Sequence, residues 1–226
     1  MIAPPEVKES EGVDAALRRL SDGLDTATQR LIDEARLLSG SDLRASSLLP
    51  GWSRAHVLAH LARGADATRS LLIGAQAGQH RPAYASYSDR DAAIGQSAAA
   101  RAEELADDVA GSAMALRTAA RQLPDEAWRY QVQGLGGARF PASQLLIRRL
   151  TEVELHHCDL GIGYGPDQWL LTFRGMQLGE PMRSQRAERL GYSQPESVRA
   201  RSMTREIPPY RPGQPLPGSW LGRRQG

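Results

Sequence analysis

Two pairs of side chains in this sequence have the chemistry and the spacing to bind a metal ion. Glu152 and His156 are four residues apart, and so are His56 and His60. On a helix, residues at i and i+4 lie on one face one turn apart, so each pair could present two donor atoms to one ion. Zinc held by three protein ligands with an open fourth position is a catalytic arrangement. The same spacing also occurs in ordinary solvated contacts on helix surfaces, and spacing alone leaves both interpretations open.

Four long amphipathic segments predict the helices that would position these pairs. Their expected ranges are 13–38, 53–77, 91–123 and 143–160. The last range contains no Gly or Pro, and its leucines recur at helical spacing. Short extended pieces are expected around the Gly-rich turn in 128–140. The predicted fold class is all-α, an antiparallel four-helix bundle, and the cores of such bundles often hold metal sites.

The last part of the chain has a different composition. Residues 165–226 contain 10 Arg, 5 acidic residues and 8 of the 14 prolines. No apolar stripe continues beyond about residue 180, and the Pro-rich run 207–218 suits neither a helix nor a central strand. We therefore predict a flexible leader at 1–11, a metal-binding helical domain at 12–164 and an irregular Pro/Arg-rich tail at 165–226.

Composition indicates a soluble globular protein and excludes several partner classes. Hydrophobic residues make up 41% of the chain and charged residues 24%, with a net charge of +2. This charge is too small, and the arginines of the tail too scattered, to predict nucleic-acid binding. No apolar run reaches the roughly 18 residues of a membrane span, and the first residues do not resemble a signal peptide. With its single cysteine, Cys158, the chain is predicted to be cytoplasmic.

Several short motifs occur in a characteristic order. They are LPGWS at 49–53, VLAHL at 57–61, RDAAI at 90–94, PA at 141–142 and EVELHHCDLG at 152–161. In this order and separation they resemble the mycothiol-dependent maleylpyruvate isomerases of actinobacteria, which belong to the wider group of DinB-like metal-binding bundles. The resemblance covers roughly residues 12–164.

The resemblance implies a divalent metal, usually zinc, bound by His60, Glu152 and His156. It also implies mycothiol as a second cofactor, so the nucleophilic thiolate comes from the cofactor and the catalytic residues of the chain itself stay unknown. That thiolate would add to the cis double bond of a small electrophilic substrate, and rotation and elimination would give fumarylpyruvate. On this interpretation Cys158 is a small buried hydrophobic residue rather than the nucleophile.

Neighbouring residues and other functions stay open. His56 could be a further ligand, a partner of a ligand or a surface residue, and Asp159 could orient the ligand imidazole of His156 or simply end the helix. His157 points about 100° away from its neighbour and is not expected to bind the metal. Relatives usually add a small α/β domain that supplies a substrate-binding arginine, which cannot be located here. The alternatives are a mycothiol S-transferase acting on another electrophile and a non-catalytic metal-binding bundle.

Overall fold

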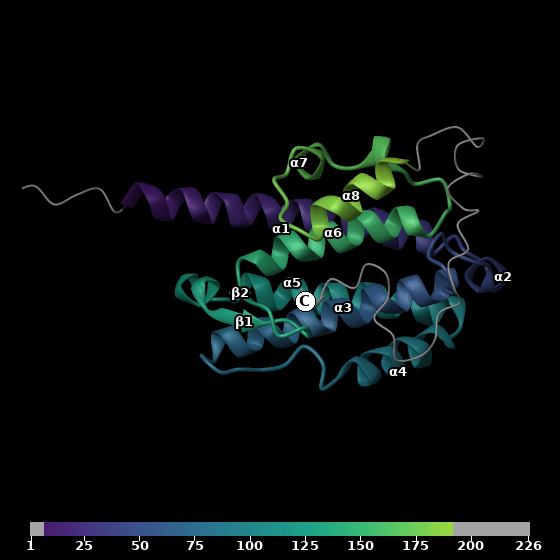
Figure 1. Cartoon of the computed structure of the whole chain (residues 1–226), viewed down its shortest axis with the longest axis horizontal. Helices are drawn as coiled ribbons and strands as arrows, with labels where there is room; N and C mark the ends of the chain where they lie inside the picture. Colours follow the sequence, from purple (N-terminus) through teal and green to yellow (C-terminus); the bar gives the residue numbers. More distant parts are fainter. Residues whose placement is uncertain (1–6, 192–226) are drawn as a thin grey trace, which may run out of the picture.

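The computed structural model describes residues 7–191, with side chains from residue 15 onward (Figure 1). Its long helices are α1 (Val7–Ala35), α3 (Arg54–Gln76), α5 (Ala102–Arg121) and α6 (Gln144–Asp159). Helix α1 packs on α5 and α6, and α3 packs on the same two helices. The described part is mostly helical, as an all-α class requires, whereas the antiparallel bundle topology stays a prediction. No helix within residues 7–191 is both long enough and apolar enough to cross a bilayer.

Shorter elements join and cover the long helices. They are α2 (Gly40–Arg44), α4 (Tyr87–Ala98), the 3₁₀ helices η1 (Asp125–Arg129) and η2 (Pro166–Gln168), β1 (Gln131–Gln133), β2 (Arg139–Pro141), α7 (Leu171–Arg174) and α8 (Met182–Leu190). The two strands pair antiparallel, with Val132 opposite Phe140. The extended pieces expected around the Gly-rich turn are therefore confirmed.

The single helix predicted for 91–123 is wrong, because the chain breaks into α4 and α5 between Ala98 and Ala102. The main-chain N–H of Arg101 donates to Glu104 Oε2 at 3.2 Å, which helps to start a new helix. Arg63 of α3 then holds both pieces, since its guanidinium donates to Ser97 Oγ at 2.8 Å and to Asp108 Oδ1 at 2.6 Å. Residues 98–102 contain no Gly or Pro, so the break between α4 and α5 depends on contacts with another helix.

The segment after residue 165 also differs from the prediction. An irregular tail was expected there, but η2, α7 and α8 occupy residues 166–190, and α8 packs on α6 (Figure 1). Helix α8 is rich in arginine, yet its Met182 and Arg189 side chains face the protein interior and are buried. Helix α1 likewise begins at Val7, inside the predicted leader. Residues 1–6 and 192–226 lie outside the described residues, and the domain limits stay a prediction.

A glycine sets how closely α3 approaches α6. A Cβ atom at Gly64 would lie 3.0 Å from Arg149 Nη1 and 3.3 Å from Glu152 Oε2. Both of these side chains are buried on α6 and paired with each other, so they have little room to move away. Gly64 therefore lets an ion pair fit between two helices in the core.

This close approach predicts a stability difference between two glycine substitutions. We expect Gly64→Ala to lower the free energy of unfolding by about 1–3 kcal/mol, because the added methyl group overpacks the interface. Gly95→Ala is the matched control, since a Cβ atom at this exposed site in α4 meets open space. It should stabilise the protein by up to about 1 kcal/mol through helix propensity. Urea denaturation measures both changes, and a Gly64→Ala variant as stable as the parent would contradict the argument.

Candidate functional site

Two histidines from different helices meet inside the protein. The rings of His60 on α3 and His156 on α6 have centroids 4.8 Å apart and cross at 84°. Both side chains are buried. Trp52, just before α3, lies with its ring centroid 5.7 Å from that of His60. The Oγ of Ser53 accepts the main-chain N–H of His56 and so caps the start of α3.

A carboxylate and an arginine stand behind His156. Nδ1 of His156 lies 2.8 Å from Asp159 Oδ2, one turn along α6. The Nε and Nη2 atoms of Arg189 on α8 donate to the two oxygens of Asp159 at 3.1 and 2.8 Å. Burial alone would raise the pKa of Asp159, but the hydrogen bond from His156 and the charge of Arg189 outweigh it and lower that pKa. Asp159 is therefore an ionised acceptor.

The ionised carboxylate fixes the tautomer of His156. A carboxylate only accepts hydrogen bonds, so Nδ1 must carry the proton, and a neutral imidazole then has its lone pair on Nε2. Nε2 is buried and has no hydrogen-bond partner within residues 7–191. A buried polar atom without a partner is costly unless something binds it. A metal ion would satisfy this atom, and a carboxylate behind the imidazole is the usual support for a metal-binding histidine.

Glu152 lies on the same helix, but its carboxylate has a protein partner. Its Oε2 accepts from Arg149 Nη1 at 3.1 Å, and Arg149 Nη2 donates to the main-chain oxygen of Leu61 at 2.8 Å. Glu152 and His60 line the same small cavity. The sequence predicted that Glu152 faces the site, but it did not reveal this arginine, three residues earlier on the same helix.

The surroundings of His60 keep its imidazole neutral. Burial, followed by the nearby charges of His156, Arg90 and Arg149, holds the pKa of His60 well below its usual range. Arg90 Nη2 lies 3.4 Å from His60 Nδ1, a long contact. A neutral imidazole keeps one nitrogen lone pair, which is the form that binds metals.

The described residues offer suitable donors, but not a closed ligand set. No group of three or more His, Cys, Asp or Glu side chains among them is arranged to hold a metal ion. Two imidazoles lie side by side and one of them has an unpartnered nitrogen, which fits a zinc or other divalent site. Glu152 would have to turn from Arg149, or share its oxygens, to become the third ligand.

The remaining candidates take other roles. His56 is partly buried, and its Nδ1 lies 2.7 Å from Ser53 Oγ at the start of α3. His157 points away from the site, stacks on Tyr164 with centroids 3.7 Å apart and lies 3.0 Å from Glu34. Burial lowers the pKa of His157 to about 3, so this ring is neutral. The structure thus separates His157 from its neighbour His156, as the helical spacing predicted.

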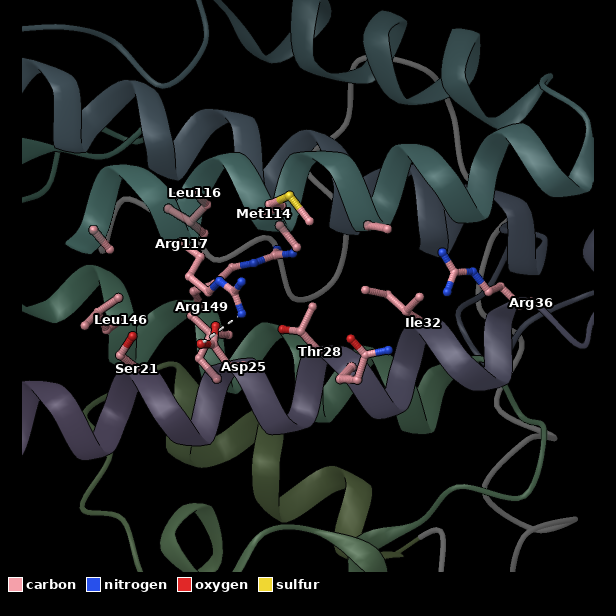
Figure 2. Close-up of a pocket in the computed structure, with 15 residues that line it drawn as sticks. Ser21, Asp25, Thr28, Ile32, Arg36, Met114, Leu116, Arg117, Leu146 and Arg149 are labelled. Atoms are coloured by element: carbon pink, nitrogen blue, oxygen red, sulfur yellow. Dashed lines mark ion pairs between the residues drawn. The ribbon is translucent and has the colours of Figure 1, made fainter. Parts of the chain in front are cut away.

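A much larger cavity lies elsewhere, between α1 and α5 (Figure 2). Its volume is about 310 Å³, against about 30 Å³ for the cavity beside His60. Asp25 lies opposite Arg117 across it, and Arg149 reaches its floor. Its lining has no histidine or cysteine, and Asp25, its one carboxylate, is paired. Size alone does not make a site, so we place the candidate site at the two histidines.

Comparison with known proteins settles the family. A model of the mycothiol maleylpyruvate isomerase N-terminal domain matches residues 24–161, more than half of the chain. The chain belongs to this family. The segment that matches the family begins within α1 and ends just after α6. It includes His60, Glu152, His156 and Asp159, whereas Arg189 lies beyond it.

Two solved structures resemble this family member. They are a mycothiol-dependent maleylpyruvate isomerase and a histidine-to-alanine mutant under the same name. Each is 27% identical, with a TM-score of 0.67 over 70% of this chain and 65% of the solved chain. The match therefore spans just under two thirds of the length of these relatives. No curated protein matches the chain.

Proposed function

We propose that this protein is a metal- and mycothiol-dependent enzyme that isomerises maleylpyruvate, or a closely related cis acid, to the trans form. The observation that carries the proposal is the buried pair of His60 and His156. In that pair, Nε2 of His156 has no partner within the described residues and Asp159 supports the ring from behind. The pair lies inside the segment that matches the isomerase family.

In this proposal His60, Glu152 and His156 hold one divalent ion, which we take to be zinc. When bound there, the ion would supply a Lewis acid that lowers the pKa of a thiol. The chain's own groups prepare the donor atoms. Asp159 holds the proton on Nδ1 of His156, and burial keeps His60 neutral.

The chemistry proposed for the substrate is reversible thiol addition. Rotation about a cis double bond needs a temporary single bond, and the addition and later loss of a thiol provide one. Trp52 and the α3–α6 interface shield the two histidines from solvent, which strengthens electrostatic interactions at the site. The four long helices are proposed to form an antiparallel DinB-like bundle that holds this site, in a protein of the cytoplasm.

One observation favours keeping a second candidate function. The match covers 65% of the solved isomerase, so the remaining part of that enzyme has no counterpart in the comparison. A mycothiol S-transferase would use the same thiol site with a different electrophile. A non-catalytic bundle would bind the metal without turnover.

An activity assay separates these functions. The zinc-loaded protein is incubated with maleylpyruvate, with and without mycothiol, and fumarylpyruvate is followed by absorbance and chromatography. Mycothiol-dependent formation of the trans acid supports the isomerase. A stable thioether product identifies a transferase instead, and zinc binding without either product identifies a non-catalytic protein.

The single cysteine gives a direct test of where the nucleophile comes from. Cys158 is buried, accepts a hydrogen bond from Trp169 Nε1 at 3.2 Å and has its pKa raised by burial to about 12. It is therefore a protonated thiol at neutral pH and a poor nucleophile. We expect Cys158→Ser to keep most of the turnover, while omission of mycothiol removes it. Loss of turnover in Cys158→Ser with normal zinc content would reject a cofactor-derived nucleophile.

A further inference from the structure

The small cavity beside His60 is lined by more positive than negative charge, and nearby carboxylates do not neutralise all of it. Its charged lining consists of Arg90, Arg148, Arg149 and Glu152, three cations and one anion. Arg149 is paired with Glu152 at 3.1 Å, and Arg90 is paired with Asp91, outside the lining, at 2.7 Å. The charge of Arg148 is the one that remains.

Arg148 has no carboxylate partner in the part of the chain that the structure describes. Its guanidinium lies 4.0 Å from the centre of the Phe140 ring, and its Nε is buried without a hydrogen-bond partner. Burial lowers the pKa of Arg148, with the charge of Glu152 as the opposing influence. Arg148 is only partly buried, but its charge is not neutralised by a carboxylate and its Nε is buried without a partner, so the guanidinium can bind an anion that enters the cavity.

Tyr84 adds a second unsatisfied group to the same cavity. Its hydroxyl is buried and has no hydrogen-bond partner within residues 7–191. Burial raises the pKa of Tyr84 well above its usual range, so the hydroxyl keeps its proton and can donate it in a hydrogen bond. The cavity thus receives two hydrogen-bond donors without a partner, one from segment 77–86 before α4 and one from helix α6.

We propose that Arg148 and Tyr84 form a binding site for a carboxylate group of the substrate, next to the two histidines. This inference rests on the proposed function, in which the substrate is a small dianionic acid. The guanidinium presents parallel N–H groups to the two carboxylate oxygens, and the tyrosine hydroxyl donates to one of them. The site would orient the acid and select anionic electrophiles over neutral ones.

The size of the cavity favours a carboxylate over a bulkier anion. Its volume is about 30 Å³, and a cavity needs roughly 10–15 Å³ on this measure to hold one water molecule. The space therefore matches about two water positions, which the two oxygens of one carboxylate would replace. A phosphate or a sugar would need the lining residues to move.

Direct binding tests the site without relying on turnover. Maleate, a cis dicarboxylate, is titrated calorimetrically into the zinc-free full chain, so that it cannot bind through the metal. We expect Arg148→Met to weaken maleate binding by about 10–100-fold and Tyr84→Phe by about 10-fold, as for hydrogen bonds to charged groups. Arg139→Met, an exposed arginine on β2 beside Phe140, removes the same charge outside the lining and should leave the affinity unchanged.

A second variant and a parallel assay separate the possible failures. Arg148→Lys keeps the charge but not the paired N–H groups, and its affinity should fall between those of the parent and Arg148→Met. No maleate binding by the parent protein, or equal binding by parent and Arg148→Met, would overturn the site. Zinc and mycothiol binding and isomerase activity are measured on the same samples. Maleate binding that depends on Arg148, in a protein without isomerase activity, supports the site and rejects the proposed function.

Discussion

The His60→Ala variant is expected to lose stoichiometric zinc binding. In the proposed site His60 supplies one of only two imidazole ligands, and its ring directly faces His156. Removing it leaves no other donor of the same kind on α3 at that position, because His56 lies one turn earlier, in contact with Ser53. Zinc content per chain, measured by atomic spectroscopy after dialysis, is the readout.

The adjacent histidine of α6 provides the control for this experiment. His157→Ala removes a buried imidazole of the same type, but one that stacks on Tyr164 and contacts Glu34 instead. We expect this variant to keep one zinc per chain and to be less stable, since it leaves a cavity in the core. One zinc retained by His60→Ala, or lost by a folded His157→Ala, would reject the proposed ligand assignment.

The second large effect is expected from Arg189→Met on α8. This change leaves Asp159 without its buried cationic partner, and breaking a buried ion pair in this way costs about 3–5 kcal/mol of stability. Asp159 is also the group that orients His156, so zinc affinity should fall by about 10–100-fold, as for other groups that support a metal ligand. Chemical denaturation and zinc competition titrations measure the two effects separately.

Arg183→Met is the matched control on the same helix. Arg183 is exposed and pairs with exposed Glu180, so its loss should change stability by no more than about 1 kcal/mol and should not affect zinc. Reduced stability with unchanged zinc affinity in Arg189→Met would mean that Arg189 only anchors α8. Restoration of zinc affinity in Arg189→Lys would support its role in positioning Asp159.

The sequence predicted the long helices well where local patterning determines them. The expected range 53–77 became α3 at Arg54–Gln76, and 143–160 became α6 at Gln144–Asp159, because an apolar stripe defines each helix and Ser53 caps α3. The break between α4 and α5 escaped prediction, since contacts of Arg63 with two different segments hold it in place. Helix α8 was not predicted for a similar reason. Tertiary packing buries its Arg189, and the arginine-rich sequence of the helix does not indicate this.

The candidate site shows the same division. Helical spacing predicted that Asp159 could reach His156 and that His157 would face away from it. In the structure Asp159 contacts His156, and His157 instead contacts Glu34. Their roles at a metal stay predictions. The pairing of Arg189 with Asp159 depends on which helices meet in space, which one sequence does not reveal. Arg149 lies three residues before Glu152 on the same helix, and this spacing was the signal available for their pairing.

Most residues of this site lie on one helix, and this limits which changes of the family segment the site can tolerate in evolution. Arg148, Arg149, Glu152, His156 and Asp159 all lie on α6. Their mutual directions are fixed by the helical repeat, in which each residue adds about 100° of rotation and about 1.5 Å of rise. A substitution changes one of these groups, whereas a one-residue insertion or deletion between Arg149 and Asp159 turns every group beyond it away from its partners. The length of this stretch should therefore vary less among functional homologues than its composition does.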